Sequence, residues 1–233
     1  MPIAIINAMH KEHERLASLL TNAKKVHTGS AHFVEGRLDG KCMVLSVCGI
    51  GKVNAAVGAV EMIRRYNPQA IVNTGVAGGL DKSLHVMDIV AGARVAYHDV
   101  DCGPEAELGQ VQGLPKYFEA SPTLLAEALQ AKESTKVEAG LIVSGDRFIT
   151  KQEDLAQIKS LYPDALAVDM ESGAIAQVCH LYGVPFLSLR IVSDTPGETD
   201  HFAQYTNFWG EMAERSFEVT RKVVERLTRL SKI

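Results

Sequence analysis

The sequence contains no long apolar run and little net charge. No window approaches the roughly 18 uninterrupted apolar residues that a membrane-spanning helix needs. Lys and Arg number 24 against 28 Asp and Glu, a formal net charge of −4, so we expect no nucleic-acid or membrane partner. The first twelve residues lack a basic segment before their apolar stretch, which predicts a cytoplasmic protein without a secretory signal.

Cysteine is scarce, and the chain has no C-x-x-C pair. This spacing excludes a structural zinc site and a redox dithiol, and we expect buried, reduced thiols at Cys42, Cys48, Cys102 and Cys179.

A metal site is also not expected at the His10-x-x-His13 pair, although Glu12 lies between the two histidines. The i, i+4 spacing of zinc metalloproteases is missing and no third ligand is evident. We therefore predict a solvated helix face for both histidines, and neither a metal nor a cofactor.

The 233 residues have an ordinary globular composition, with 46% hydrophobic and 22% charged residues. Neither a repeat nor a flexible linker divides them, so we expect one domain over residues 1–233. Short apolar runs alternate with helical patterns, which is typical of crossover units around a mostly parallel sheet. The predicted strands are Ile3–Ile6, Cys42–Cys48, Ala70–Asn73, Asp88–Tyr97, Leu141–Ser144, Leu166–Val168 and Val184–Ser193.

The predicted helices are His10–Leu20, Lys52–Tyr66, one that begins at Ser121-Pro122, Glu171–Tyr182 and a long closing helix, Tyr205–Leu230. Two connections, Asp99–Phe118 and Thr195–Gln204, are unusually long. Loops of this length inside a compact domain are often functional.

Two glycine-rich segments follow predicted strands. Gly49-Ile50-Gly51-Lys52 is not a phosphate loop, because Val53 replaces the required Ser or Thr, nor a dinucleotide fingerprint, because Asn54 replaces its third glycine. It is either a tight turn close to a small ligand or a tight turn alone. Gly75–Gly79 either presents backbone amides to a ligand beyond the sheet edge or meets a conformational need.

Three acids, Glu12, Glu171 and Asp194, follow predicted strands, where open α/β sheets place reacting groups. Each could instead be a charge that stabilises a helix N-terminus. Acids gathered at one sheet edge with few cations suit a reaction that builds positive charge on a sugar, such as glycosidic cleavage. Such a reaction needs an acid for the leaving group, a base for water and an acceptor for the hydroxyls.

A set of short motifs in a fixed order is highly specific. It comprises Ile5–Met9 with Glu12, Gly49–Val53, Asn73–Gly75 with Ala77–Gly79, Tyr97–Asp99, Gly140–Asp146, Asp169–Glu171, and Arg190 with Ser193-Asp194. Through these motifs, essentially the whole chain resembles the 5′-methylthioadenosine/S-adenosylhomocysteine nucleosidases of the purine nucleoside phosphorylase superfamily. The resemblance implies a three-layer α/β/α fold with a central mixed, mostly parallel twisted sheet, and a homodimer.

The implied activity is hydrolysis of the N-glycosidic bond of 5′-methylthioadenosine, S-adenosylhomocysteine and 5′-deoxyadenosine to adenine and the thioribose product, in methionine salvage. The resemblance assigns Asp194 as the general acid at purine N7, which requires it to keep its proton near neutral pH. Glu12 would be the base for water, with Arg190 positioning that water. Glu171, backed by Met170, would accept hydrogen bonds from the ribose hydroxyls.

The remaining substrate contacts implied by the resemblance surround the purine and the 5′ group. The purine would lie near Phe148, with the backbone of Ile149 reading its edge. The other implied substrate-binding residues are Gly78 and Ser193 on the purine side, and Met9 and Ile50 on the sugar and thioether side. Bulky Ala8-Met9 would crowd out the phosphate of a phosphorylase.

Departures from the family pattern leave the 5′ group open. Val76 stands where many members carry a small polar residue, Asp169 replaces a more usual Glu, and Cys102–Leu108 lacks the apolar residues that usually line the 5′ pocket. Alternatives are the same hydrolysis on another 5′-substituted adenosine such as aminodeoxyfutalosine, a purine nucleoside phosphorylase, or a nucleoside-binding protein without catalysis. Either Phe202 or Tyr205 would close the pocket.

Overall fold

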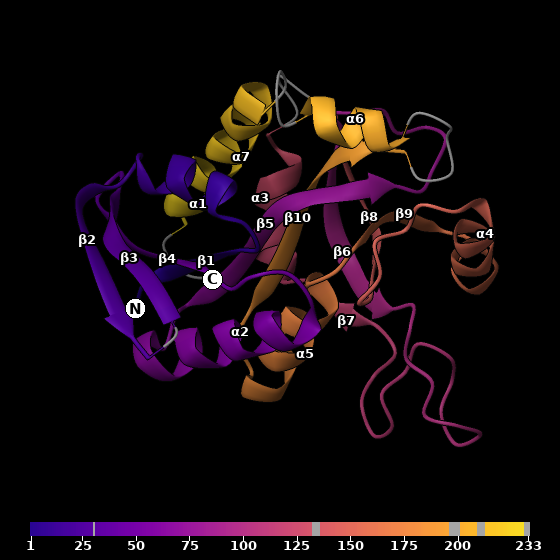
Figure 1. The fold of residues 1–233 in the computed structure, drawn as a ribbon. Helices are drawn as coiled ribbons and strands as arrows, with labels where there is room; N and C mark the ends of the chain where they lie inside the picture. Colours follow the sequence, from indigo (N-terminus) through magenta and orange to yellow (C-terminus); the bar gives the residue numbers. More distant parts are fainter. Residues whose placement is uncertain (30, 132–135, 196–200, 209–212, 231–233) are drawn as a thin grey trace.

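The computed structural model describes residues 1–233 except 30, 132–135, 196–200, 209–212 and 231–233 (Figure 1). The strands are β1 (Ile3–Asn7), β2 (Thr21–Thr28), β3 (Ala31–Leu38), β4 (Lys41–Val47), β5 (Ala70–Gly79), β6 (Ile89–Tyr97), β7 (Phe118–Glu119), β8 (Val137–Ser144), β9 (Ala165–Asp169) and β10 (Phe186–Asp194). The helices are α1 (His10–Ala17), α2 (Lys52–Tyr66), α3 (Pro122–Leu129), α4 (Gln152–Leu161), α5 (Ser172–Tyr182), α6 (His201–Asn207) and α7 (Ala213–Thr228).

Across the described residues, ten strands form one sheet in the order β10-β6-β8-β9-β5-β1-β4-β3-β2, with β7 paired to β6. Because β10 also pairs with β5, the strands β5, β9, β8, β6 and β10 close into a ring. The strands β4, β1, β5 and β10 are parallel to one another, and the hairpins and the pairs β5–β9 and β6–β10 are antiparallel. The predicted mixed α/β sheet is therefore confirmed.

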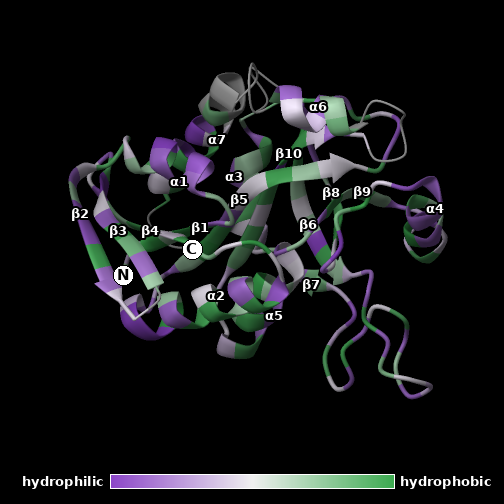
Figure 2. Cartoon of the chain, in the orientation of Figure 1, coloured by the Kyte–Doolittle hydropathy of each residue, from purple (hydrophilic) through white to green (hydrophobic). Residues whose placement is uncertain are grey.

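Helices cover both faces of the sheet (Figure 1). Successive side chains of a strand point to opposite faces, so Ile3 and Ile5 of β1 pack in one core with residues of α1, α3 and α7. Ala4 and Ile6 of the same strand pack in a second core with residues of α2 and α5. In Figure 2, α2 and α5 interleave hydrophobic and hydrophilic residues, as expected for a helix with one buried face.

Several predicted boundaries are confirmed. The helix Lys52–Tyr66 is α2, and it ends where Asn67 adopts a left-handed conformation. Ser121 is the N-cap residue of α3 and Pro122 is its first residue, as the sequence predicts. The connection between β6 and β7 contains no helix or strand over residues 98–117. No described helix combines the length and the apolar character needed to span a membrane.

Other predictions about the elements are wrong. β5 extends through Gly75–Gly79 instead of ending at Asn73, because glycine accepts extended backbone as readily as a turn. The predicted closing helix Tyr205–Leu230 is two helices, α6 and α7, and residues 209–212 between them lie outside the described part. Residues 196–200 of the predicted loop Thr195–Gln204 also lie outside it, and α6 already begins at His201.

The predictions for cysteine and histidine are only partly right. All four cysteines are free, but only Cys179 is buried; Cys42 and Cys102 are exposed and Cys48 is intermediate. His10 is exposed as predicted, whereas His13, on the same helix, is buried. Desolvation lowers the pKa of His13 to about 4, so a neutral imidazole can replace an apolar side chain there.

Candidate active site

One cavity of about 660 Å³, counted with its open mouth, lies beyond the carboxyl ends of β1, β5, β9 and β10. Every residue that the sequence analysis assigned to the site lines it, namely Met9, Glu12, Ile50, Gly78, Phe148, Ile149, Met170, Glu171, Arg190, Ser193 and Asp194. Open α/β sheets place ligands in this position. The structure thus brings together residues spread over most of the sequence.

Asp194 is the last residue of β10 and is 2% exposed. The register of β10 with β5 shifts between Val192 and Asp194, which places Asp194 opposite Gly78. Such a bulge re-aims a side chain at the end of a strand. The hydroxyl of Ser193 donates a hydrogen bond of 2.6 Å to Oδ1 of Asp194.

Glu12 comes from the first turn of α1, is partly buried and lines the cavity. The backbone amides of Met9 and Val76 donate hydrogen bonds of 3.3 and 3.2 Å to it. Desolvation raises the pKa of Glu12 to about 7, although the positive charge of Arg190 acts in the opposite direction. A carboxylate with this pKa suits a general base at neutral pH.

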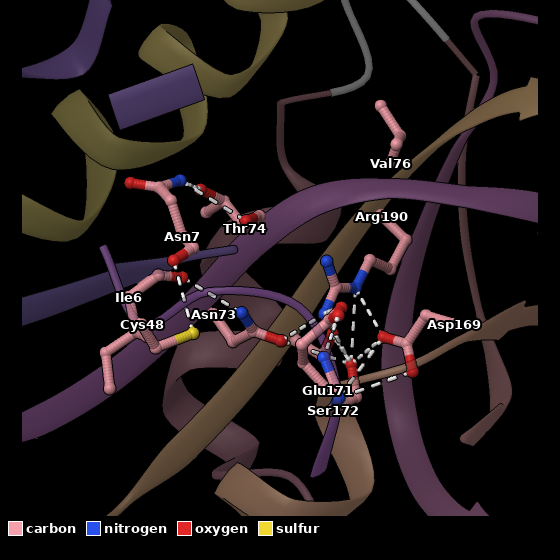
Figure 3. Close-up of polar contacts among 12 residues, drawn as sticks. Ile6, Asn7, Cys48, Asn73, Thr74, Val76, Asp169, Glu171, Ser172 and Arg190 are labelled. Carbon is pink, nitrogen blue, oxygen red and sulfur yellow. Dashed lines mark hydrogen bonds and ion pairs between the residues drawn. The ribbon is translucent and has the colours of Figure 1, made fainter. Parts of the chain in front are cut away.

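Arg190 lies in the middle of β10 with 1% of its surface exposed, and its guanidinium is surrounded by carboxylates and an amide (Figure 3). Its Nε is 2.6 Å from Oδ2 of Asp169, and its Nη2 is 3.7 Å from Oε2 of Glu171. Nη2 also donates to Oδ1 of Asn73. Desolvation opposes the charge of Arg190, but the nearby carboxylates outweigh it and raise its pKa.

Gly75 of β5 leaves the space that Glu12 and Arg190 occupy. A Cβ atom on Gly75 would lie 3.0 Å from Oε1 of Glu12 and would clash with Nη1 of Arg190. This close approach explains the glycine, so the alternative of a purely conformational need does not hold at this position. Among the described residues, Nη1 of Arg190 has no hydrogen-bond partner, and it can therefore bind a molecule in the cavity.

Glu171 is the N-cap residue of α5 and is 5% exposed. Its Oε1 accepts a hydrogen bond of 3.1 Å from the amide of Gly51. Desolvation raises the pKa of Glu171, Arg190 opposes this effect and Asp169 reinforces it. The carboxylate can accept hydrogen bonds from a ligand's hydroxyl groups, since an ionised carboxylate offers about four acceptor sites.

The Gly49–Lys52 segment is a tight turn that also lines the cavity. Gly49 and Gly51 have φ values of 91° and 93°, which favour glycine, while Ile50 between them is 53% exposed at the cavity wall. The Lys52 amide donates a hydrogen bond of 2.7 Å to Asp146. The segment is thus a tight turn that reaches the cavity wall through Ile50.

Aromatic residues form another part of the wall. The rings of Phe148 and Tyr205 meet edge to face, with centroids 5.3 Å apart. Tyr205 lines the cavity, whereas Phe202 is 64% exposed and is not among the lining residues. Tyr205 is therefore the aromatic residue that closes this side of the pocket in the described structure.

Sequence reasoning gave no role to the lining residues Ala77, Arg147 and Val168. It named Ala8 only as a bulky residue, and Val76 and Asp169 only as departures from the family pattern. Arg147 directly precedes Phe148, and Asp169 belongs to the Asp169–Glu171 motif. Their closeness in sequence to assigned residues could have indicated that they line the cavity. Within the described ranges, no three His, Cys, Asp or Glu side chains are grouped to hold a metal ion.

Comparisons with known proteins give a consistent result. The sequence model described as "Phosphorylase superfamily" matches residues 2–225. The 5′-methylthioadenosine/S-adenosylhomocysteine nucleosidase of Actinobacillus succinogenes is 41% identical over 222 residues, covering 94% of this chain and 96% of that protein. The Bacillus anthracis nucleosidase of the same name is 38% identical over 231 residues, covering 97% of this chain and all of the relative.

The chain is also closely similar to solved structures. The Neisseria meningitidis 5′-methylthioadenosine/S-adenosylhomocysteine nucleosidase in complex with methylthio-immucillin-A has a TM-score of 0.90 at 41% identity, covering 96% of this chain and 98% of that chain. A futalosine hydrolase of Helicobacter pylori has a TM-score of 0.89 at 28% identity and covers 97% of both chains. Overall shape alone therefore does not separate these two activities, whereas sequence identity favours the first.

Proposed function

The chain belongs to the 5′-methylthioadenosine/S-adenosylhomocysteine nucleosidases of the phosphorylase superfamily, and from this premise we propose that its cavity is the catalytic site. The enzyme is an N-glycosyl hydrolase that acts on 5′-methylthioadenosine, S-adenosylhomocysteine and 5′-deoxyadenosine and releases adenine. The observation that carries this proposal is the meeting of Glu12 and Nη1 of Arg190 above Gly75 on the cavity wall, where Nη1 has no hydrogen-bond partner among the described residues.

The first catalytic role is that of the base. Glu12 accepts the proton of a water molecule that Nη1 of Arg190 holds beside it. A pKa of about 7 keeps a large fraction of Glu12 ionised at neutral pH and makes it a stronger base than an ordinary carboxylate. Holding water and base in one geometry removes much of the entropic cost of the attack.

The second role is that of the acid. Adenine is a poor leaving group as an anion, and Asp194 protonates N7 so that it departs as a neutral molecule. Ser193 holds Oδ1 of Asp194 through its 2.6 Å hydrogen bond. That bond fixes the carboxyl group, which gives its proton to the purine, and the purine lies against Phe148 and the backbone of Ile149.

The third role is stabilisation of the ribosyl cation. Glu171 accepts hydrogen bonds from the 2′ and 3′ hydroxyls, and its negative charge favours the positive charge that develops on the ring. Met170 and Met9 pack against the sugar and the 5′ group, and Ile50 covers them from the turn. These apolar side chains match a thioether better than an ionised group.

Hydrolysis is favoured over phosphorolysis by the charges in the cavity. Phosphate carries negative charge, and it would meet the carboxylates of Glu12, Glu171 and Asp169. Two arginines line the cavity: Arg190 has its Nε and Nη2 already paired, and Arg147 forms an ion pair with Asp154. Water, which is neutral, does not experience this repulsion.

One assay tests the proposed function. Adenine release is measured from 5′-methylthioadenosine, S-adenosylhomocysteine, 5′-deoxyadenosine and aminodeoxyfutalosine, with and without phosphate. We expect release from the first three without phosphate. Preference for aminodeoxyfutalosine would show that this nucleoside is the substrate. A requirement for phosphate would show that the enzyme is a phosphorylase.

The enzyme also forms a homodimer in this proposal. Ile50, Val53 and Val57 are 53%, 74% and 51% exposed and lie on the turn before α2 and on its outer face. Exposed apolar residues that adjoin one another are typical of an interface. Because Ile50 also lines the cavity, a second copy seated here would complete the cavity wall.

Light scattering after gel filtration tests the dimer. The double variant Val53→Asp/Val57→Asp is expected to elute as a monomer, and the control Lys24→Asp on the exposed strand β2 is expected to remain a dimer. A monomeric wild-type protein, or a dimeric double variant, would exclude this interface.

A further inference from the structure

The proposed mechanism leaves one buried charge of the site without a function. Asp169, the last residue of β9, forms a 2.6 Å ion pair with Nε of Arg190, and both side chains are 1% exposed. β9 and β10, which carry the two residues, both pair with β5. The attraction within a buried ion pair offsets the free energy of desolvation only when the geometry is excellent. A contribution to stability is therefore a weak explanation for this pair beside the cavity.

The three nitrogens of Arg190 have different surroundings (Figure 3). Asp169 and Ser172 hold Nε, the latter at 3.2 Å. Asn73 and Ser172 accept from Nη2, and Glu171 lies 3.7 Å away from it. Nη1 is the nitrogen that remains toward Glu12 above Gly75.

Asp169 is itself fixed by several donors. The amide and the hydroxyl of Ser172 both donate to its carboxylate, and the hydroxyl also contacts Ser188 at 2.6 Å. Asn73, which accepts from Arg190, donates to the carbonyl of Ile6 at 2.9 Å. The guanidinium is therefore anchored on its far side to two strands and a helix terminus.

We propose that Asp169 is a positioning residue, which binds Nε of Arg190 so that Nη1 stays beside Glu12 and the attacking water. Three carboxylates surround this single guanidinium. Without Asp169, the nearest remaining carboxylate is Glu171, and Arg190 turns toward it and away from Glu12. The inference rests on the proposed function, because it assigns Asp169 to the same reaction.

The proposal predicts a specific change in pH dependence. The charged groups that face Glu12 are Arg190 from β10 and Glu171 at the start of α5; the thiol of Cys48 lies near them. Arg190 lowers the pKa of Glu12, so its withdrawal raises that pKa. If Asp169 were only a nearby negative charge, its removal would instead lower the pKa of neighbouring acids.

The experiment compares Asp169→Asn and Asp169→Glu with wild type in adenine release from 5′-methylthioadenosine between pH 5 and 9. For Asp169→Asn we expect kcat to fall roughly ten- to hundred-fold, as for other small displacements of a catalytic group. The acidic limb of kcat/KM is expected to move to higher pH. Asp169→Glu keeps the charge, and we expect both quantities to lie closer to wild type.

The matched control is Asp164→Asn, which removes an exposed partner of Arg94 and should change neither quantity. An unshifted or lowered acidic limb in Asp169→Asn would overturn the proposal, even if kcat falls. If circular dichroism shows that Asp169→Asn is unfolded, Ser172→Ala replaces it and must give the same upward shift. Absence of adenine release by wild type would contradict the proposed function itself, which separates the two failures.

Discussion

The side chains of Glu12 and Arg190 approach the same point above the backbone of Gly75, although Glu12 comes from α1 and Arg190 from β10. Oε1 of Glu12 would lie 3.0 Å from a Cβ atom at this glycine, and Nη1 of Arg190 would lie closer still. Despite this cation, desolvation raises the pKa of Glu12 to about 7. Burial thus outweighs the nearby positive charge, and the site obtains a base that titrates near neutrality.

The first prediction concerns the pH dependence of wild type. Glu12 acts as a base only when it is ionised, and its pKa is about 7. We therefore expect kcat/KM for 5′-methylthioadenosine to fall about tenfold per pH unit below pH 7. His13 cannot produce this limb, because its pKa is lowered to about 4. A profile that stays flat down to pH 5 would contradict the assignment of Glu12.

The second prediction concerns stability. The pKa of Glu12 is raised from 4.5 to about 7 in the folded state, so the folded protein binds the extra proton between these values. The associated stability is present below pH 4.5 and lost as the pH rises through 7. Glu12→Gln avoids this loss, and we expect it to be roughly 1–3 kcal/mol more stable than wild type at pH 8.

Urea unfolding at pH 8 and pH 5 measures this difference. The advantage of Glu12→Gln should be smaller at pH 5, where Glu12 of wild type is protonated. Glu14→Gln, an exposed change on the same helix, should not alter stability in this way. A destabilised Glu12→Gln at pH 8 would show that Arg190 stabilises the carboxylate more than burial disfavours it.

The sequence predicted the parts of the fold that have strong patterns. The apolar strands β1, β4 and β10 and the helix α2 lie where continuous apolar runs or a 3.6-residue period placed them. The hairpin strands β2 and β3 were missed. β2 is exposed along nearly its whole length, so it carries no alternation of apolar and polar residues to detect. The short helix α4 was missed as well.

The site was predictable where a chemical group follows a strand, and not where its role depends on a partner. Glu12, Glu171 and Asp194 could be found from their positions after strands, and they do share one cavity. The ion pair of Asp169 with Arg190 joins residues 21 positions apart through the tertiary fold. Spacing along the chain carries no signal for such a contact.

The third prediction concerns the general acid. Asp194→Asn keeps the shape of the side chain and can still accept the hydrogen bond from Ser193, but it cannot release a proton. We expect turnover of 5′-methylthioadenosine to fall by about 10²- to 10⁴-fold with unchanged thermal unfolding. A ribosyl substrate with p-nitrophenolate, which leaves without protonation, should lose far less. An equal loss for both substrates would mean that Asp194 is not the acid.

The fourth prediction concerns ribose recognition by Glu171. Glu171→Gln removes charge-assisted hydrogen bonds worth roughly 1.5–3 kcal/mol, so kcat/KM should fall about ten- to hundred-fold. The preference for a ribonucleoside over its 2′,3′-dideoxy analogue is expected to shrink by the same factor. Glu153→Gln on the exposed start of α4 serves as the control. An unchanged preference in Glu171→Gln would remove the ribose contact from the mechanism.

The fifth prediction tests the space above Gly75. In Gly75→Ala, the new methyl group clashes with Nη1 of Arg190 and approaches Oε1 of Glu12. Neither charged group can move aside without losing some of its hydrogen bonds or ion pairs. We expect a loss of about 1–3 kcal/mol in stability and a large loss of turnover.

Gly92→Ala is the matched control, because its methyl group would press on Cδ1 of Ile142 at 2.8 Å and on no cavity residue. It should cost stability, measured by urea unfolding, and leave turnover nearly unchanged. If Gly75→Ala lost only as much turnover as Gly92→Ala, the arrangement of Glu12 and Arg190 would not need the missing side chain. A selective loss in Gly75→Ala instead means that this glycine is required by the catalytic pair and not by the strand.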